Sequence, residues 1–132
     1  MVSPAVICIG EALVDRLGPL GGDPSVGGPV DDRLGGAPAN VACGLARLGT
    51  PVGFFGCLGD DLIGEQFSAL FQHRGVESSG LQMNPDRPSR IVLVRRNQEG
   101  ERQFQGFAGD QGQGVADQDL GPIHLPNGAC CL

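Results

Sequence analysis

Four residues in the first third of the chain have the types and spacing that binding a polar ligand requires. Gly35 and Gly36 stand directly before an expected helix, and Asn40 falls near its first turn. Asp15 follows the first expected strand, near the carboxyl end at which ligands of open α/β sheets collect. Glycine lets a ligand approach the backbone closely, and a helix N-terminus offers free N–H groups. A carboxylate, a carboxamide and backbone amides are together the acceptors and donors that a polyhydroxyl ligand needs.

The same residues also have a plainer interpretation, in which Asp15 is a solvated loop residue, the glycines form a simple turn and Asn40 is a helix cap. The common nucleotide motifs do not decide between the two. A P-loop needs GxxxxGK[ST], and this helix start has no lysine; a dinucleotide fingerprint needs GxGxxG after a strand, which "GEALVD" does not supply. The residues alone leave both interpretations open.

The elements that must position these residues alternate between strand and helix. "AVICI" at residues 5–9 and "PVGFF" at residues 51–55 are short apolar runs typical of buried strands. Pro38 suits the first turn of a helix that ends before Gly49. The apolar face of that helix is predicted at three positions of helical spacing: Val41, Leu45 and Leu48. Strand, helix, strand is the βαβ pattern of a parallel sheet.

A second helix is predicted to end at Gly75, and either Asp60 or Asp61 can cap its start. Its apolar positions are Ile63, Phe67, Leu70 and Phe71. Further along, Arg90 to Arg96 and Arg102 to Phe107 flank the turn-forming "NQEGE" and predict a β-hairpin.

The remaining segments are less regular. Residues 18–36 contain ten glycines and prolines among nineteen positions, which predicts a loop with one short exposed strand near "VDDRL". "VADQDL" is expected to start a helix, and "LPNGACCL" reads as a turn that enters an apolar strand.

Composition limits the partners and the compartment. A net charge of −6, with only nine arginines and lysines, argues against nucleic acid or an anionic membrane surface as partner. The five cysteines are an odd number and are interpreted as reduced, in a cytosolic protein. Adjacent Cys130 and Cys131 lack the spacing of a zinc site, which favours core packing for them. We expect neither a signal peptide nor a membrane span.

The stretch "GGAPANVACGLARLGTPVGFFGCLGDDLIGEQF" closely resembles the first signature of the ribokinase/phosphofructokinase-B (pfkB) family of carbohydrate kinases. "ICIGEALVD" looks like the opening strand of that family, and "PSRIVLVRRNQEGERQF" fits its lid region. "GGAPANVA" looks more like the fructokinase branch than ribokinase, whose pattern has a lysine where this chain has Ala37.

The resemblance implies a ribokinase-like α/β fold: a mostly parallel sheet flanked by helices, with a small β-sheet lid at about residues 16–34 and 90–107. Residues 1–132 are then the N-terminal part of one carbohydrate kinase domain, truncated before the ATP-binding half. The resemblance also implies transfer of the ATP γ-phosphoryl group to a sugar hydroxyl, with magnesium. The residues implied to bind the sugar are Asp15, Gly35, Gly36 and Asn40.

The catalytic base of such kinases lies in a Gly-Ala-Gly-Asp motif, which we expect beyond Leu132. "GFAGD" at residues 106–110 imitates it but leads into "QGQG", a poor helix start, and Asp110 is not assigned as the base. We therefore expect this chain to hold the sugar but to bind ATP and magnesium poorly and to be inactive alone.

Two other functions stay open: a stand-alone sugar-binding or inert fragment, and a kinase for a nucleoside or a keto-deoxy sugar acid. In the full-length protein, a homodimer through the lid is a further expectation.

Overall fold

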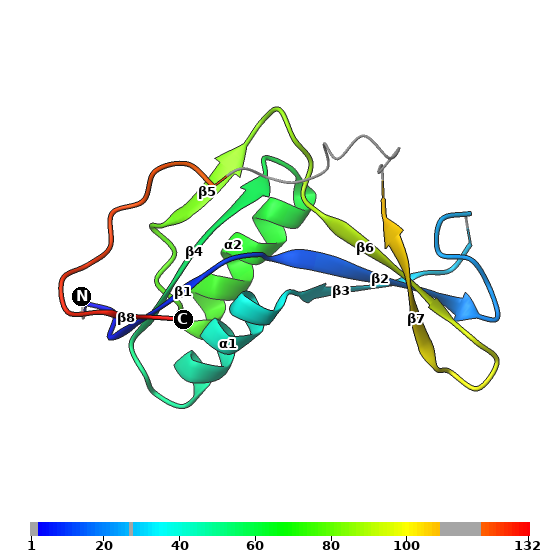
Figure 1. Cartoon of the computed structure of the whole chain (residues 1–132), viewed down its shortest axis with the longest axis horizontal. Helices are drawn as coiled ribbons and strands as arrows, with labels where there is room; N and C mark the ends of the chain where they lie inside the picture. Colours follow the sequence, from blue (N-terminus) through cyan, green and yellow to red (C-terminus); the bar gives the residue numbers. More distant parts are fainter. Residues whose placement is uncertain (1–2, 27, 109–119) are drawn as a thin grey trace.

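The structure is a computed structural model and describes residues 3–26, 28–108 and 120–132. Its strands form two four-stranded sheets, shown in Figure 1. The first sheet has the order β5-β4-β1-β8, and every neighbouring pair in it is parallel. Its strands are β1 (Val6–Ile9), β4 (Val52–Gly59), β5 (Leu81–Asn84) and β8 (Cys130–Cys131). Together with the helices α1 (Ala37–Arg47) and α2 (Leu62–Arg74), this sheet is called the body below.

The second sheet, called the accessory sheet, projects from one end of the body (Figure 1). Its order is β3-β2-β6-β7, and it consists of β2 (Leu13–Leu20), β3 (Asp31–Gly35), β6 (Ile91–Arg96) and β7 (Arg102–Phe107). The pairs β2–β3 and β6–β7 are antiparallel, whereas β2 and β6 are parallel. The fold is therefore the expected α/β arrangement of a parallel sheet with helices and a small second sheet.

Both ends of α2 follow from its sequence as predicted. The Asp61 carboxylate caps the helix by accepting a hydrogen bond of 3.0 Å from the N–H of Gly64. At the other end Gly75 takes the left-handed conformation, with φ 78°, that terminates many helices. The two rings on the buried side of α2, Phe67 and Phe71, are packed against each other and against Phe54 of β4.

The predicted apolar face of α1 is wrong at two of its three positions: Leu45 is partly buried against the core, but Val41 and Leu48 are not. Val41 is exposed and Leu48, the residue after the helix, is 83% exposed, whereas Ala39 and Ala42 are fully buried. A stripe of small residues at the same helical spacing, continued by the partly buried Cys43 and Ala46, faces the core instead. Small side chains let α1 lie close to the parallel sheet, so the alanines compete successfully with the larger residues.

Strand β2 is a second correction, because the sequence predicted a loop from residue 18 onward and placed Asp15 after the first strand, in no strand of its own. Asp15 instead lies within β2, which runs on to Leu20. The pairing of β2 with β6 shifts register between Leu17 and Leu20, the interval that contains Gly18 and Pro19. A local irregularity of this kind lets a strand tolerate a residue without an N–H.

Cys130 and Cys131 are exposed, which contradicts the prediction that they pack in the core. They form β8 at one edge of the parallel sheet, next to β1. The predicted hairpin is confirmed as β6 and β7. Asp110 and residues 115–119 of the expected "VADQDL" helix lie outside the described residues. No helix in the described part of the chain is long and apolar enough to cross a membrane.

We expect Phe71→Ala to lower the free energy of unfolding by about 3–5 kcal/mol, the usual cost of a cavity left by a deleted core ring. Phe71 is completely buried, and its ring centroid lies 4.8 Å from that of Phe54 and 5.7 Å from that of Phe67. The matched control is Phe104→Ala, because Phe104 is 63% exposed. Urea unfolding followed by circular dichroism measures both, and an equal effect of the two changes would contradict this description of the core.

Candidate functional site

The antiparallel pairing of β2 with β3 brings Asp15 against Gly35. In the ladder Leu13 lies opposite Gly35 and Asp15 lies opposite Arg33. The half-buried Asp15 carboxylate leans diagonally over Gly35, where an added Cβ would lie 2.6 Å from Oδ2. A side chain at position 35 would push this carboxylate away. Asp15 and Gly35 are therefore in contact, although they are 20 positions apart in the sequence.

Gly36 connects β3 to α1 and has a conformation that requires glycine. Its φ is 99°, and an added Cβ would lie 2.7 Å from the carbonyl oxygen of Glu11. Gly36 is also the N-cap of α1, where no side chain caps the helix and the first turn holds no acidic residue. The first turn of α1 therefore provides no carboxylate to neutralise the positive end of the helix dipole.

Asn40 lies one helical turn further on. Its N–H donates a hydrogen bond of 2.9 Å to the carbonyl oxygen of Gly36, and its side chain is exposed. The four predicted residues therefore lie on adjoining elements: Asp15 on β2, Gly35 at the end of β3, Gly36 between β3 and α1, and Asn40 in the first turn of α1. That they bind a ligand stays a prediction.

The face of the accessory sheet that bears Asp15 carries Arg33 on β3 and apolar residues toward β6 and β7. Asp15 lies beside Val92 of β6, which in turn pairs with Phe107 of β7. Because residues in register on neighbouring strands share one face, these three side chains form a row across the sheet. The guanidinium of Arg90 lies 4.1 Å from the centroid of the Phe107 ring, a cation–π contact. An acceptor next to apolar and aromatic groups suits the alternating O–H and C–H surfaces of a carbohydrate.

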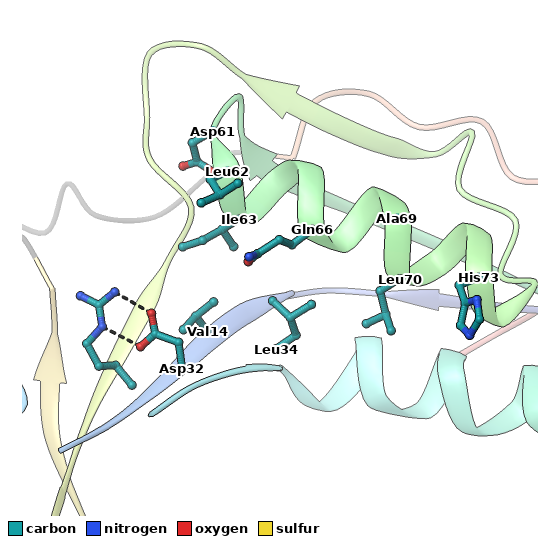
Figure 2. Close-up of a pocket in the computed structure, with 11 residues that line it drawn as sticks. Val14, Asp32, Leu34, Asp61, Leu62, Ile63, Gln66, Ala69, Leu70 and His73 are labelled. Carbon is teal, nitrogen blue, oxygen red and sulfur yellow. Dashed lines mark hydrogen bonds and ion pairs between the residues drawn. The ribbon is translucent and has the colours of Figure 1, made fainter. Parts of the chain in front are cut away.

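A groove that was not predicted lies on the opposite side of the accessory sheet. It is a groove of about 790 Å³ between α2 and the strands β2 and β3. Figure 2 shows Val14 and Leu34 on the strands facing Ile63 and Leu70 of α2 across it. Since successive side chains of a strand point to opposite faces, Val14 and Arg16 lie on the other side from Asp15. None of the four predicted residues lines this groove.

One end of the groove holds a two-point ion pair. The Nε and NH2 groups of Arg16 each donate a hydrogen bond of 2.7 Å to the carboxylate of Asp32. The hydrogen bonds from Arg16 lower the pKa of Asp32, against the opposing effect of partial burial. Arg16 and Asp32 are paired with each other, so their charges are already compensated at this end of the groove. Among the described residues, no group of three or more His, Cys, Asp and Glu side chains forms a metal-binding cluster.

The parallel sheet with its helices, joined to the accessory sheet at Gly36, defines the ribokinase-like class of α/β folds. A family model described as "pfkB family carbohydrate kinase" matches residues 3–120, and the chain belongs to this family.

Individual relatives agree with the family. A probable fructokinase-6, chloroplastic, from Arabidopsis thaliana is 36% identical over 103 residues, which are 77% of this chain and 27% of the relative. An aminoimidazole riboside kinase from Salmonella typhimurium is 44% identical over 70 residues, 53% of this chain and 22% of that protein. The crystal structure of a fructokinase with bound ATP from Xylella fastidiosa aligns with a TM-score of 0.66 at 36% identity, over 81% of this chain and 33% of that structure. The chain thus spans about a quarter to a third of the length of these proteins.

We expect Gly36→Ala to destabilise the chain by about 2 kcal/mol or more, since a left-handed backbone alone costs a non-glycine residue roughly 1–2 kcal/mol and the new methyl group also meets the Glu11 carbonyl. The control is Gly44→Ala, within α1, where an added Cβ meets nothing within 4 Å. That change should stabilise the chain by about 0.5–1 kcal/mol through helix propensity. Urea unfolding of both variants tests the difference in sign.

Proposed function

We propose that this chain is the sugar-binding part of an ATP-dependent, fructokinase-like sugar kinase. Its ligand is held by Asp15, Gly35, Gly36 and Asn40. The observation that carries the proposal is the contact of the Asp15 carboxylate with Gly35, directly beside the uncapped start of α1. Membership of the pfkB family supports a sugar as the ligand.

The geometry gives each of these residues a distinct task. The Asp15 carboxylate accepts hydrogen bonds from sugar hydroxyls, and the Asn40 carboxamide both donates and accepts. Gly35 leaves room for the Asp15 carboxylate, and Gly36 supplies the positive-φ connection that places Asn40 in the first turn of α1. Because Asp15 and Gly35 belong to the accessory sheet and Asn40 to the body, a sugar bound by all of them is held from two sides.

In this proposal the accessory sheet acts as the lid over the sugar. Closing a lid keeps water away from the phosphoryl group, which otherwise is lost to hydrolysis. The apolar row of Val92 and Phe107 beside Asp15 supports this role. The exposed Phe104, whose ring packs edge-on against Phe107 at 5.4 Å between centroids, supports the further proposal that two lids associate in a full-length homodimer.

The residues present do not fit ATP and magnesium in the way that they fit a sugar. The sequence contains no Gly-Ala-Gly-Asp motif and no P-loop, and the described residues hold no acidic cluster for a metal. We therefore propose that residues other than these 132 bind ATP and magnesium and supply the catalytic base. We also propose that the protein works in the cytosol.

A nucleoside is the competing substrate class, because one relative of this chain is an aminoimidazole riboside kinase. Titration with fructose, other hexoses, ribose, a keto-deoxy sugar acid and a riboside separates the candidates. Tightest binding of fructose supports the proposal, and tightest binding of a riboside favours the competitor. Absence of binding to any of them leaves an inert fragment.

We expect Asp15→Ala to weaken fructose binding by about 10- to 100-fold, because hydrogen bonds to a charged group contribute about 1.5–3 kcal/mol. Asp32→Ala is the matched control, an aspartate of the same sheet on the opposite face, and should change the dissociation constant by less than about twofold. Isothermal titration calorimetry gives both constants, and circular dichroism verifies the fold. Equal losses in the two variants would contradict the proposed site.

We also expect the 132-residue chain to form no fructose phosphate when it is incubated with fructose, ATP and magnesium. The physical reason is that positioning and charge neutralisation around the γ-phosphate carry most of phosphoryl transfer, and this chain offers no motif for either. Phosphate transfer from radiolabelled ATP is the measurement. Turnover by the chain alone would show that its own residues supply the nucleotide site.

A further inference from the structure

The accessory sheet is joined to the body by connecting segments and by limited packing. Among the described elements, the backbones lie close together mostly within each of the two parts, whereas between the parts the side chain of Leu34, on β3, packs against the core of the body. The groove of about 790 Å³ separates α2 from β2 and β3 on one side (Figure 2). The chain crosses between the two parts at residues 10–12, at Gly36, at residues 85–90 and between β7 and β8. The first three crossings lie entirely within the described residues, and the orientation of the sheet depends in part on them.

Two of the crossings contain a glycine in a conformation open to few other residues. Gly10 has φ 149° and Gly36 has φ 99°. Neither glycine has a side chain that could tie the crossing to the body through hydrogen bonds. These two crossings are held by the backbone instead: the N–H of Gly10 donates a hydrogen bond of 3.0 Å to the carbonyl oxygen of Phe55, and the carbonyl oxygen of Gly36 accepts one of 2.9 Å from the N–H of Asn40.

The third crossing is tied down by side chains. The N–H of Ser89 donates a hydrogen bond of 2.7 Å to Oδ2 of Asp61, and its hydroxyl donates another of 2.7 Å to Oδ1. The same hydroxyl accepts a hydrogen bond of 3.0 Å from the N–H of Gly59, at the end of β4. Oδ1 of Asp61 also accepts the bond from Gly64 that caps α2. We call this group the Asp61–Ser89 clamp.

The clamp is closely packed as well as hydrogen-bonded. Ser89 is only 4% exposed. An added Cβ at Gly59 would lie 2.5 Å from the nitrogen of Ser89 and 2.8 Å from the carbonyl oxygen of Arg87. Burial raises the pKa of Asp61, but the hydrogen bonds from Ser89 and Gly64 outweigh it and the net shift is downward. The carboxylate is thus held in its charged form at the joint.

The clamp also lies immediately before the strand that faces the predicted site. The carbonyl oxygen of Arg90 accepts a hydrogen bond of 3.0 Å from the N–H of Val14, and β6 starts at the next residue. Val92 then lies beside Asp15. The position of Ser89 consequently sets where β6 enters the sheet, and with it how the Asp15 face is presented to the body.

We propose that Asp61 and Ser89 are positioning residues, which form a fixed pivot of the accessory sheet at the crossing of residues 85–90. The pivot sets the angle between Asp15, on the sheet, and Asn40, on the body. Its effect on sugar affinity rests on the function proposed above, whereas its effect on the crossing at residues 85–90 does not.

Two variants separate the pivot from the helix cap. Asp61→Asn keeps an oxygen for the N–H of Gly64, and asparagine is a good N-cap, but its NH2 group faces the N–H of Ser89, so two donors meet. Ser89→Ala removes only the hydroxyl that bridges Gly59 and Asp61. The control is Ser79→Ala, an exposed serine of the body whose hydroxyl donates to Glu77 at 2.8 Å.

Hydrogen–deuterium exchange of the 132-residue chain is the first measurement. We expect the amides of Gly59 and of the non-proline residues at 85–90 to exchange at least tenfold faster in both clamp variants, with the amides of α2 within twofold of the original chain. The control should change neither. If α2 loosens as much as residues 85–90, or if nothing changes, the clamp is only a helix cap and the proposal is overturned.

The fructose dissociation constant is the second measurement. If the pivot sets the angle of the site, a smaller fraction of molecules has the binding geometry, and the constant should rise at least fivefold in Ser89→Ala but not in Ser79→Ala. Faster exchange at residues 85–90 with an unchanged constant would overturn the positioning role. If the original chain binds no fructose, the proposed function fails, and the exchange pattern alone decides the pivot.

Discussion

The antiparallel pairing of β2 with β3 is the interaction on which the candidate site depends. It places the Asp15 carboxylate over Gly35, although 20 positions separate the two in the chain. The pairing also ends at Gly35, so the chain passes directly from β3 to Gly36, the N-cap of α1. A one-residue slip in this pairing would turn Asp15 to the groove side, because the side chains of a strand alternate between faces. The register of a single short ladder thus decides on which face a charged acceptor is presented.

Much of the local structure could be predicted because its causes are local. Asp61 and Gly75 mark the ends of α2 through capping chemistry within a few residues, and the β6–β7 hairpin is indicated by the turn residues between two apolar runs. The missed elements depend on tertiary context. β2 tolerates Gly18 and Pro19 because its register with β6 shifts there. The buried face of α1 consists of alanines because the sheet lies close to it, and no periodicity ranks alanine above leucine.

The site was predictable in part for the same reason. Asn40 and the glycine pair are neighbours in sequence, so their spacing carries the signal, and Asp15 was found through its place near the first strand and through family resemblance. The Asp61–Ser89 clamp joins residues 28 positions apart through a buried serine. A lone serine in a polar stretch gives no sign in the sequence that it will be buried. Contacts of this kind become visible only when the topology brings their elements together.

The division of the site between two parts of the molecule connects these observations. Asp15 and Gly35 move with the accessory sheet, whereas Asn40 moves with α1, and Gly36 lies at the boundary. The β2–β3 ladder ends at Gly35, and the carbonyl oxygen of Gly36 accepts the N–H of Asn40 in the first turn of α1, so the two halves of the site meet at Gly36. The angle between the two parts therefore sets the distance between the halves. Any variation in this angle therefore lowers the affinity for a ligand that contacts both halves of the site. The hydrogen bonds of the clamp are charge-assisted and contribute about 1.5–3 kcal/mol each, which is enough to narrow the range of angles. A site shared between two parts of the molecule needs a fixed joint, and the Asp61–Ser89 clamp supplies one at the crossing of residues 85–90.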